Sequence, residues 1–261
     1  MIKERVLVSL PGKCPLNCKH CFALEQEEEG FSSMDEVIES ISDKNFDIIY
    51  VSHLKENFVN PEEGVCFCER LFERYRKDIC VTSRCVLTDV FIQRLSRLNA
   101  AMKEQGHRLF WCESIPALES AALTEDLSKI PTPHERINFL EKLENAGITT
   151  IMSVRPLFPS SSISKNEIGR LIEYAKNCVS AVITGGLIVT PQIEKRFSID
   201  TQNWEYSENN SDYLVGVIKN NAKFVDVNKE LTVLSDCCKK NSIPFFLHSM
   251  QAINYCLANA I

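Results

Sequence analysis

The sequence has no long apolar segment and no excess of basic residues. No hydrophobic run approaches the roughly 18 to 20 residues that a membrane-spanning helix needs, and the opening Met-Ile-Lys-Glu-Arg lacks the apolar core of a signal peptide. Lys and Arg number 29 against 35 Asp and Glu, so the formal net charge is -6. Phosphate neutralisation supplies most of the affinity for duplex nucleic acid, and this balance argues against such a partner. We expect a cytoplasmic protein with no membrane span.

Internal repeats and low-complexity segments are also absent from the sequence. With 44% hydrophobic and 25% charged residues, the composition is that of a globular protein rather than a disordered one. A chain of 261 residues is long enough for one α/β barrel. Cysteine, in contrast, is plentiful, with 12 in the chain. In a reducing cytosol such a number indicates metal ligation, catalysis or core packing rather than disulfides.

Short β-branched runs alternate with longer segments of helical period along the first 190 residues. This alternation is typical of parallel strands joined by crossover helices. It predicts an α/β fold, a partial (β/α)6 barrel of the TIM type over residues 1–190, with the strand C-termini and the functional site on one face. Residues 191–261 are expected to form a short helical C-terminal extension that caps the same domain. We expect strands near 5–10, 47–52, 78–85, 107–115, 148–156 and 180–190, and helices near 33–42, 61–76, 88–104, 133–146 and 164–178.

Three cysteines follow the first expected strand at short spacing. Cys14, Cys18 and Cys21 lie within residues 11–22. Cys thiolates hold iron–sulfur clusters at spacings of this kind. Since only three ligands are local, one iron is left open to a small molecule, which indicates catalysis rather than electron storage. The alternative is a structural zinc site completed by His20 or a distant residue. We favour the cluster, because zinc fingers more often pair cysteines with two residues between them, and a structural site has no need to open onto a barrel mouth.

The Cys-x3-Cys-x2-Cys pattern after the first strand, with a partial (β/α)6 barrel behind it, resembles the radical S-adenosylmethionine superfamily. The resemblance covers about residues 5–190. It implies that a 4Fe-4S cluster binds the methionyl group of S-adenosylmethionine and that one electron from the cluster breaks the sulfonium bond. A 5′-deoxyadenosyl radical would then act on an organic substrate. The resemblance also implies sensitivity to oxygen and an electron donor such as a flavodoxin or ferredoxin.

Later segments are similar to the spore photoproduct lyase-like branch of this superfamily. The similarity implies that Arg84 and Ser114, at the ends of the third and fourth strands, contact the carboxylate or ribose of S-adenosylmethionine. For Arg84 a salt bridge at the barrel rim is the alternative. His20 takes a position that is commonly aromatic in the family and lies by the adenine. The similar segments are Val81-Thr82-Ser83-Arg84, Glu113-Ser114-Ile115-Pro116-Ala117, and motifs within residues 135–159.

The segment after the second strand departs from the family pattern. Many members carry Gly-Gly-Glu there, which binds the amino group of S-adenosylmethionine, whereas residues 51–57 read Val-Ser-His-Leu-Lys-Glu-Asn. We expect Ser52, His53, Glu56 or Asn57 to substitute. The DNA-repair lyase has a hydrogen-donating cysteine near this point, and its replacement here, together with the acidic charge, argues against thymine-dimer repair.

The remaining cysteines are mostly expected in the core, because free cysteine behaves as a small buried hydrophobe. Cys85 and Cys112 lie in or beside strands whose ends face the site, where a thiol could give a hydrogen atom to a product radical. Core packing is the alternative for both. Gly185 and Gly186 in the sixth strand would let the backbone approach a flat ligand such as adenine, unless they only mark a bulge.

These features together predict a radical S-adenosylmethionine enzyme with a nucleoside-type or small-metabolite substrate. A nucleobase or nucleoside is suggested only by the resemblance. The alternative function is a non-catalytic metal-binding module that holds zinc or an iron–sulfur cluster. That module would have a fourth protein ligand and would not cleave S-adenosylmethionine.

Overall fold

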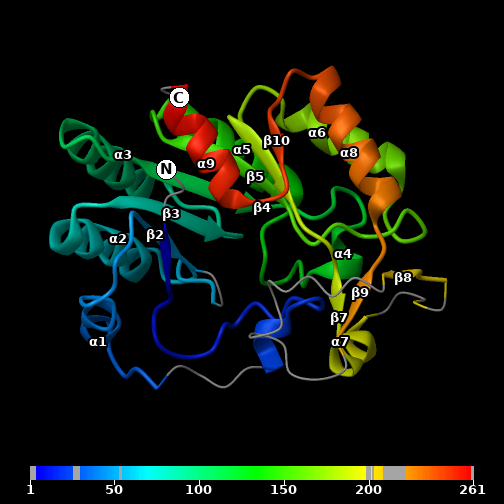
Figure 1. Cartoon of the computed structure of the whole chain (residues 1–261), viewed down its shortest axis with the longest axis horizontal. Coiled ribbons are helices and arrows are strands. Elements are labelled where there is room, and N and C mark those ends of the chain that lie inside the picture. Colours follow the sequence, from blue (N-terminus) through cyan, green and yellow to red (C-terminus); the bar gives the residue numbers. More distant parts are fainter. Residues whose placement is uncertain are drawn as a thin grey trace.

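A computed structural model describes residues 4–25, 30–52, 55–197, 201, 203–207 and 222–259 of the chain (Figure 1). Its centre is a seven-stranded parallel sheet in the order β1-β2-β3-β4-β5-β6-β10. The expected partial barrel of the TIM type is confirmed, with one further strand from the C-terminal part. The strands are β1 (Arg5–Val8), β2 (Ile48–Val51), β3 (Asp78–Ser83), β4 (Leu109–Ser114), β5 (Thr149–Val154), β6 (Ala181–Thr184) and β10 (Phe245–Phe246).

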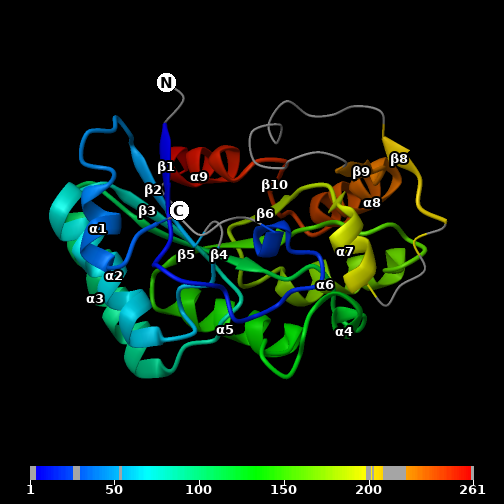
Figure 2. The same cartoon turned by 90° about the horizontal axis from the view of Figure 1, so that it is seen from below.

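Seven of the described helices lie on the two faces of this sheet, unequally divided. Six of them pack their apolar residues against the outer face, and α9 (Ser249–Ala258) lies against the inner one (Figure 2). The outer helices are α1 (Met34–Glu39), α2 (Pro61–Tyr75), α3 (Asp89–Glu104), α5 (Pro133–Asn145), α6 (Lys165–Ala175) and α8 (Asn228–Lys240). None of the described helices combines the length and the apolar character needed to cross a membrane.

Local signals account for where α5 begins and ends. In α5, Thr132 and Glu135 form a capping box and Pro133 occupies the first turn, which satisfies amide groups that the helix itself cannot bond. The helix is followed by Gly147 at a φ of 77°, a conformation that costs glycine little.

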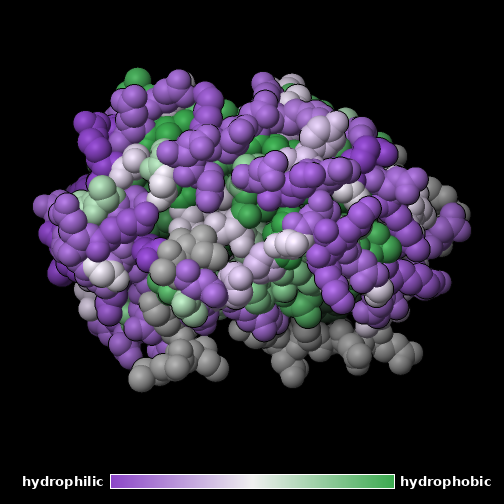
Figure 3. All heavy atoms as spheres, turned by 90° about the horizontal axis from the view of Figure 1, so that it is seen from above, coloured by the Kyte–Doolittle hydropathy of each residue, from purple (hydrophilic) through white to green (hydrophobic). Residues whose placement is uncertain are grey.

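Successive residues of the strands β2 to β6 face two different apolar cores. In β4, Leu109 and Trp111 pack under the outer helices, whereas Phe110 and Cys112 pack in the inner core with α9. This alternation follows from the two-residue period of a strand. Toward the C-terminal ends of the strands the inner positions become polar, and these residues belong to neither apolar core. On the face seen in Figure 3 the surface is mostly hydrophilic, and hydrophobic residues are visible mainly between polar ones.

The C-terminal part contains strands as well as the expected helices. The predicted strand near 180–190 is divided: β6 ends at Thr184, and after Gly185 and Gly186 the chain starts β7 (Ile188–Val189). This strand belongs to a separate three-stranded sheet in the order β7-β9-β8, with β8 (Tyr206–Ser207) and β9 (Lys223–Val225). The short helix α7 (Pro191–Arg196) follows β7 directly. The chain then returns to the barrel through α8, β10 and α9. Residues beyond 190 therefore supply one strand of the sheet and one helix on each of its faces.

Candidate active site

The three motif cysteines lie in the loop after β1, at the edge where the parallel strands end. All three are free; Cys18 is buried, and Cys14 and Cys21 are half-buried. Cys18 packs with Leu16 and Ile130, and the other two contact the same small apolar cluster. We call residues 11–25, which end in the helical turn η1 (Phe22–Glu25), the cysteine loop.

The donor set of this loop fits a 4Fe-4S cluster. In the part of the chain that the structure describes, no group of three or more His, Cys, Asp or Glu side chains is arranged to hold one metal ion. A zinc ion draws its ligands to about 2.0–2.3 Å from a single point, whereas an iron–sulfur cluster is held by separate thiolates on its several irons. Three free thiols lie beside one small group of apolar side chains. They match the ligands of a 4Fe-4S cluster that keeps one iron open.

The connection between β2 and α2 supports the cysteine loop. The main-chain amide of Glu56 donates to Sγ of Cys14 at 3.5 Å, and Oδ1 of Asn57 accepts from the amide of Leu10 at 3.1 Å. Lys55 donates to the main-chain oxygen of Pro11. The segment that stands in place of Gly-Gly-Glu therefore contacts the cysteine loop mainly near its start.

The carboxylate of Glu56 joins the ends of β2 and β3. Its Oε1 accepts from the amide of Phe58 and from Oγ of Ser83, both at 3.0 Å, and its Oε2 accepts from the amide of Arg84 at 2.8 Å. Burial raises the pKa of Glu56. The predicted contact of Glu56 with the amino group of S-adenosylmethionine would therefore compete with three donors of the protein. Ser52 is buried at a φ of 70°, and His53 lies outside the described residues.

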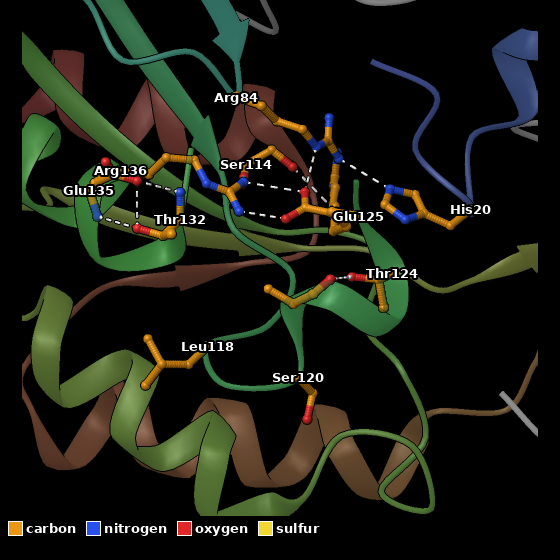
Figure 4. Close-up of polar contacts among 12 residues, drawn as sticks. His20, Arg84, Ser114, Leu118, Ser120, Thr124, Glu125, Thr132, Glu135 and Arg136 are labelled. Carbon is orange, nitrogen blue, oxygen red and sulfur yellow. Dashed lines mark hydrogen bonds and ion pairs between the residues drawn. The ribbon is translucent and has the colours of Figure 1, made fainter. Parts of the chain in front are cut away.

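Arg84 extends from the end of β3 toward the cysteine loop and forms the salt bridge that was the alternative interpretation. Its Nε donates to Oε1 of Glu125 at 2.9 Å, and its Nη2 lies 3.2 Å from Nε2 of His20. Glu125 is also bound by Arg136, whose Nη1 lies 3.3 Å from the same oxygen and also donates to the main-chain oxygen of Ser114. Figure 4 shows the carboxylate of Glu125 between the two guanidinium groups, with His20 beyond Arg84.

Burial and charge set the protonation states of this network. Burial, reinforced by the guanidinium of Arg84, lowers the pKa of His20 to about 3, so the imidazole is neutral and Nε2 can accept from Arg84. Burial alone would raise the pKa of Glu125, but Arg136 and Arg84 outweigh it and lower that pKa. Burial raises the pKa of Cys18 to about 12, although Arg84 opposes the rise. Burial outweighs the cation of Arg84, so the thiol of Cys18 keeps its proton at neutral pH in the metal-free protein.

Buried polar atoms without a hydrogen-bond partner gather near the ends of the strands. Within the described residues they include Oγ of Ser52, Nδ2 of Asn57, Oγ1 of Thr82 and Nε of Arg155. An unpaired buried group of this kind costs about 1–3 kcal/mol, so such groups normally find a partner. These four atoms lie within or after β2, β3 and β5, while others, such as Oγ of Ser180 and Nε of Arg196, lie outside this group.

Gly185 and Gly186 differ in their surroundings. A Cβ built on Gly185 would lie 2.9 Å from Nε of Arg155, whereas none of the atoms around Gly186 comes within 4 Å of such a Cβ. Arg155 Nη2 donates to the main-chain oxygens of Thr184, at 2.8 Å, and of Leu247, at 2.5 Å. The glycine at 185 therefore makes room for an arginine side chain, and Gly186 is the one open to a ligand. Ser114 is buried, and its Oγ donates to the main-chain oxygen of Arg155 at 3.3 Å.

The two candidate hydrogen donors lie on different sides of the sheet. Cys112 is buried in the inner core with Tyr50 and Cys80. Cys85 is half-buried, packs against the outer core, and its amide donates to Oγ of Ser83 at 2.9 Å. Burial raises the pKa of Cys112 to about 11 and that of Cys85 further still, so both thiols keep their proton at neutral pH.

Glu125, Arg136 and Arg155 were not among the predicted site residues. Arg136 had a detectable signal, because it lies on the apolar stripe of α5 with Leu140 and Leu143, where a charge needs a buried partner. Glu125 follows the short helix α4 (Ala121–Thr124) in an irregular segment. Its role depends on tertiary contacts that no local pattern records.

Neither a protein-family model nor a curated protein sequence matches the chain. Solved structures do match. Spore photoproduct lyase complexed with dinucleoside spore photoproduct is 12% identical with a TM-score of 0.62, and the match covers 89% of this chain and 71% of that one. A radical SAM methyltransferase from Sphaerobacter thermophilus is 14% identical with a TM-score of 0.59, covering 94% and 65%.

SuiB from Streptococcus suis bound to S-adenosylmethionine is a further match, at 10% identity and a TM-score of 0.57 over 94% of this chain and 50% of that one. Identities this low show a shared fold. The predicted resemblance to the radical S-adenosylmethionine superfamily, and to spore photoproduct lyase within it, is confirmed at that level.

Proposed function

We propose that the chain is a radical S-adenosylmethionine enzyme that holds a 4Fe-4S cluster on Cys14, Cys18 and Cys21. The observation that carries the proposal is the convergence of three free thiols on one apolar cluster, in the loop at the C-terminal edge of a partial barrel. When bound, the cluster supplies the electron that cleaves the sulfonium bond and so starts radical chemistry on an organic substrate.

The residues around the loop would bind and orient S-adenosylmethionine. Arg84 is paired with Glu125 and also brings its positive charge beside the cysteines, so the carboxylate of the ligand is assigned to it as a second anion. Ser52 and Thr82 offer unpaired hydroxyl groups, and Asn57 an unpaired amide nitrogen. Neutral His20 lies by the adenine, and Gly186 leaves the backbone open on the β6 side.

The substrate is assigned to the nucleoside type or to small metabolites. The fold shared with a lyase that was solved with a dinucleoside spore photoproduct supports the first class. The net charge of -6 disfavours duplex nucleic acid. A flavodoxin or ferredoxin would supply electrons in the cytoplasm.

The test is to reconstitute the protein with iron and sulfide without oxygen, add dithionite and S-adenosylmethionine, and measure 5′-deoxyadenosine by mass spectrometry. Cys18→Ala should abolish the product. Cys66→Ala is the matched control, because this thiol is also half-buried but lies on α2, and it should leave the product unchanged. Equal product from Cys18→Ala would refute the proposal, and bound zinc without cleavage would support the metal-binding module instead.

Cys112, rather than Cys85, is the hydrogen-atom donor in this proposal, because it lies on the inner face of the barrel. The S–H bond breaks homolytically, its hydrogen atom goes to the carbon radical, and the electron donor reduces the remaining thiyl radical. In deuterated water, exchange makes this thiol a source of deuterium. Deuterium in the substrate-derived product should therefore fall in Cys112→Ala and persist in Cys85→Ala, measured as the mass shift of that product. The reverse pattern would assign the role to Cys85.

A further inference from the structure

A second segment, which follows β6 and the glycine pair, also reaches the cysteine loop. We call residues 188–197, which comprise β7, α7 and Phe197, the strap. Nη2 of Arg196 donates to the main-chain oxygen of Cys21 and to Oε1 of Glu25, both at 2.8 Å. Figures 1 and 2 show η1, the end of the cysteine loop, next to α7. The strap thus contacts the backbone of a proposed cluster ligand directly.

One carboxylate oxygen of Glu25 joins the two ends of α7. Thr190 caps this helix by accepting from the amide of Ile193 at 3.1 Å, and its hydroxyl donates to Oε1 of Glu25 at 2.8 Å. Arg196, the last residue of α7, binds the same oxygen. The carboxylate therefore fixes the whole short helix to the end of the cysteine loop.

An aromatic cluster adds a second contact between strap and loop. Phe197 packs edge-on against Phe158 and Trp204, with ring centroids 5.8 and 5.6 Å away. Phe158 in turn packs edge-on against His20 at 6.0 Å. Such arrangements contribute to stability beyond their buried area. His20, the residue before Cys21, is thus held by aromatic rings, and Cys21 itself is held by Arg196.

We propose that the strap positions Cys21 for cluster binding and adjusts the charge around the cluster, with Arg196 as the positioning residue and Glu25 as its counter-charge. The existence of the cluster rests on the proposed function above; the contacts of the strap do not. Net charge and hydrogen bonds near the sulfurs set the reduction potential of a cluster. Loss of the Arg196 cation should therefore lower the potential, and loss of the Glu25 anion should raise it.

The first measurement uses the metal-free protein. By NMR-detected hydrogen exchange, the amide of Cys21, bonded to the main-chain oxygen of Cys18 at 3.0 Å, should exchange faster in Arg196→Gln and in Glu25→Gln. The amide of Lys19 is bonded to Thr124 at 3.1 Å and is the internal control, so its exchange should not change. Arg170→Gln is the matched control variant, because it breaks an ion pair of the same length, 2.8 Å to Glu119, on another surface.

The second measurement uses reconstituted protein. Both strap variants should lose iron to a chelator about tenfold faster than wild type, the effect typical of an outer-shell partner. Their reduction potentials, followed by EPR, should shift in opposite directions, whereas mere loosening would move both the same way. Arg196→Lys, which keeps the charge, should restore the potential more than the exchange rate.

Unchanged exchange at Cys21 in both variants would overturn the proposal, as would potentials that shift together. If wild-type protein takes up no cluster, the proposed function fails, and the exchange measurement still decides whether the strap holds the loop.

Discussion

The cysteine loop has two ionic anchors that share the same chemistry and differ in burial. In the inner anchor, the side chains of Glu125 and Arg136 are 0% exposed and that of Arg84 is 19% exposed. In the outer anchor, Arg196 is 26% exposed and Glu25 is 22% exposed. Each consists of arginine and glutamate, and each ends at a residue beside or within the cysteine motif, His20 or Cys21.

The surroundings of an ion pair, more than the identity of its two residues, decide how much the pair contributes to stability. A charge left alone in a buried site has neither water nor a partner, so breaking the pair costs more than the pair itself contributes. At the surface, water and salt replace a lost partner. We therefore expect the inner anchor to hold the fold around the loop, and the outer anchor to open first in local fluctuations.

The largest expected effect is at Glu125. Glu125→Gln keeps an acceptor oxygen but leaves two guanidinium groups without their anion, so we expect a loss of about 3–5 kcal/mol in the free energy of unfolding, measured with urea. Arg196→Gln should lose at most about 1 kcal/mol in the same measurement. Glu119→Gln, which breaks the exposed ion pair with Arg170, should show no measurable change. Equal losses for the inner and outer anchors would refute the comparison.

Much of the fold could be predicted from the spacing of apolar residues alone, because strands and helices each repeat such residues at a fixed interval. The first six strands and the helices between them lie within a few residues of their expected places. The prediction near 180–190 was wrong in one respect, since two strands replace one. Gly185 lies against Arg155 there, and the chain leaves the barrel. This packing involves residues far apart in sequence, so no local pattern indicates it.

The site was predictable only where local spacing carries the chemistry. Cys14, Cys18 and Cys21 are close in sequence and must be so to share one cluster. Glu125 reaches Arg84 across 41 residues, and Arg196 reaches Cys21 across 175, and neither pair leaves a motif. Alternate residues of a strand face opposite sides of the sheet, so the faces of Cys112 and Cys85 can be predicted only when the end of β3 is known. The ends of strands are the features that sequence patterns locate least well.

A smaller expected effect is the dependence of stability on pH. It contrasts two buried carboxyl groups on which Arg136 and Arg84 act, those of Glu125 and Glu113. Glu125 is ionised between Arg136 and Arg84, whereas burial raises the pKa of Glu113 well above its usual value despite Arg136 and a 2.8 Å bond from Nε1 of Trp111. Arg84 and Glu56 are the other charged groups that act on Glu113.

The two glutamates should therefore give stability curves of opposite slope. Glu125 has a lowered pKa in the folded state, so its contribution is present above about pH 4.3, the usual pKa of glutamate, and is lost as the pH falls. Glu113 keeps its proton when folded and loses it when unfolded above that pH, so it makes stability fall as the pH rises. Glu113→Gln should remove this fall, and its unfolding free energy relative to wild type should rise between about pH 4 and about pH 8. Curves parallel to wild type over that interval would mean that Glu113 ionises in the folded protein, and would place a second buried anion beside the inner anchor.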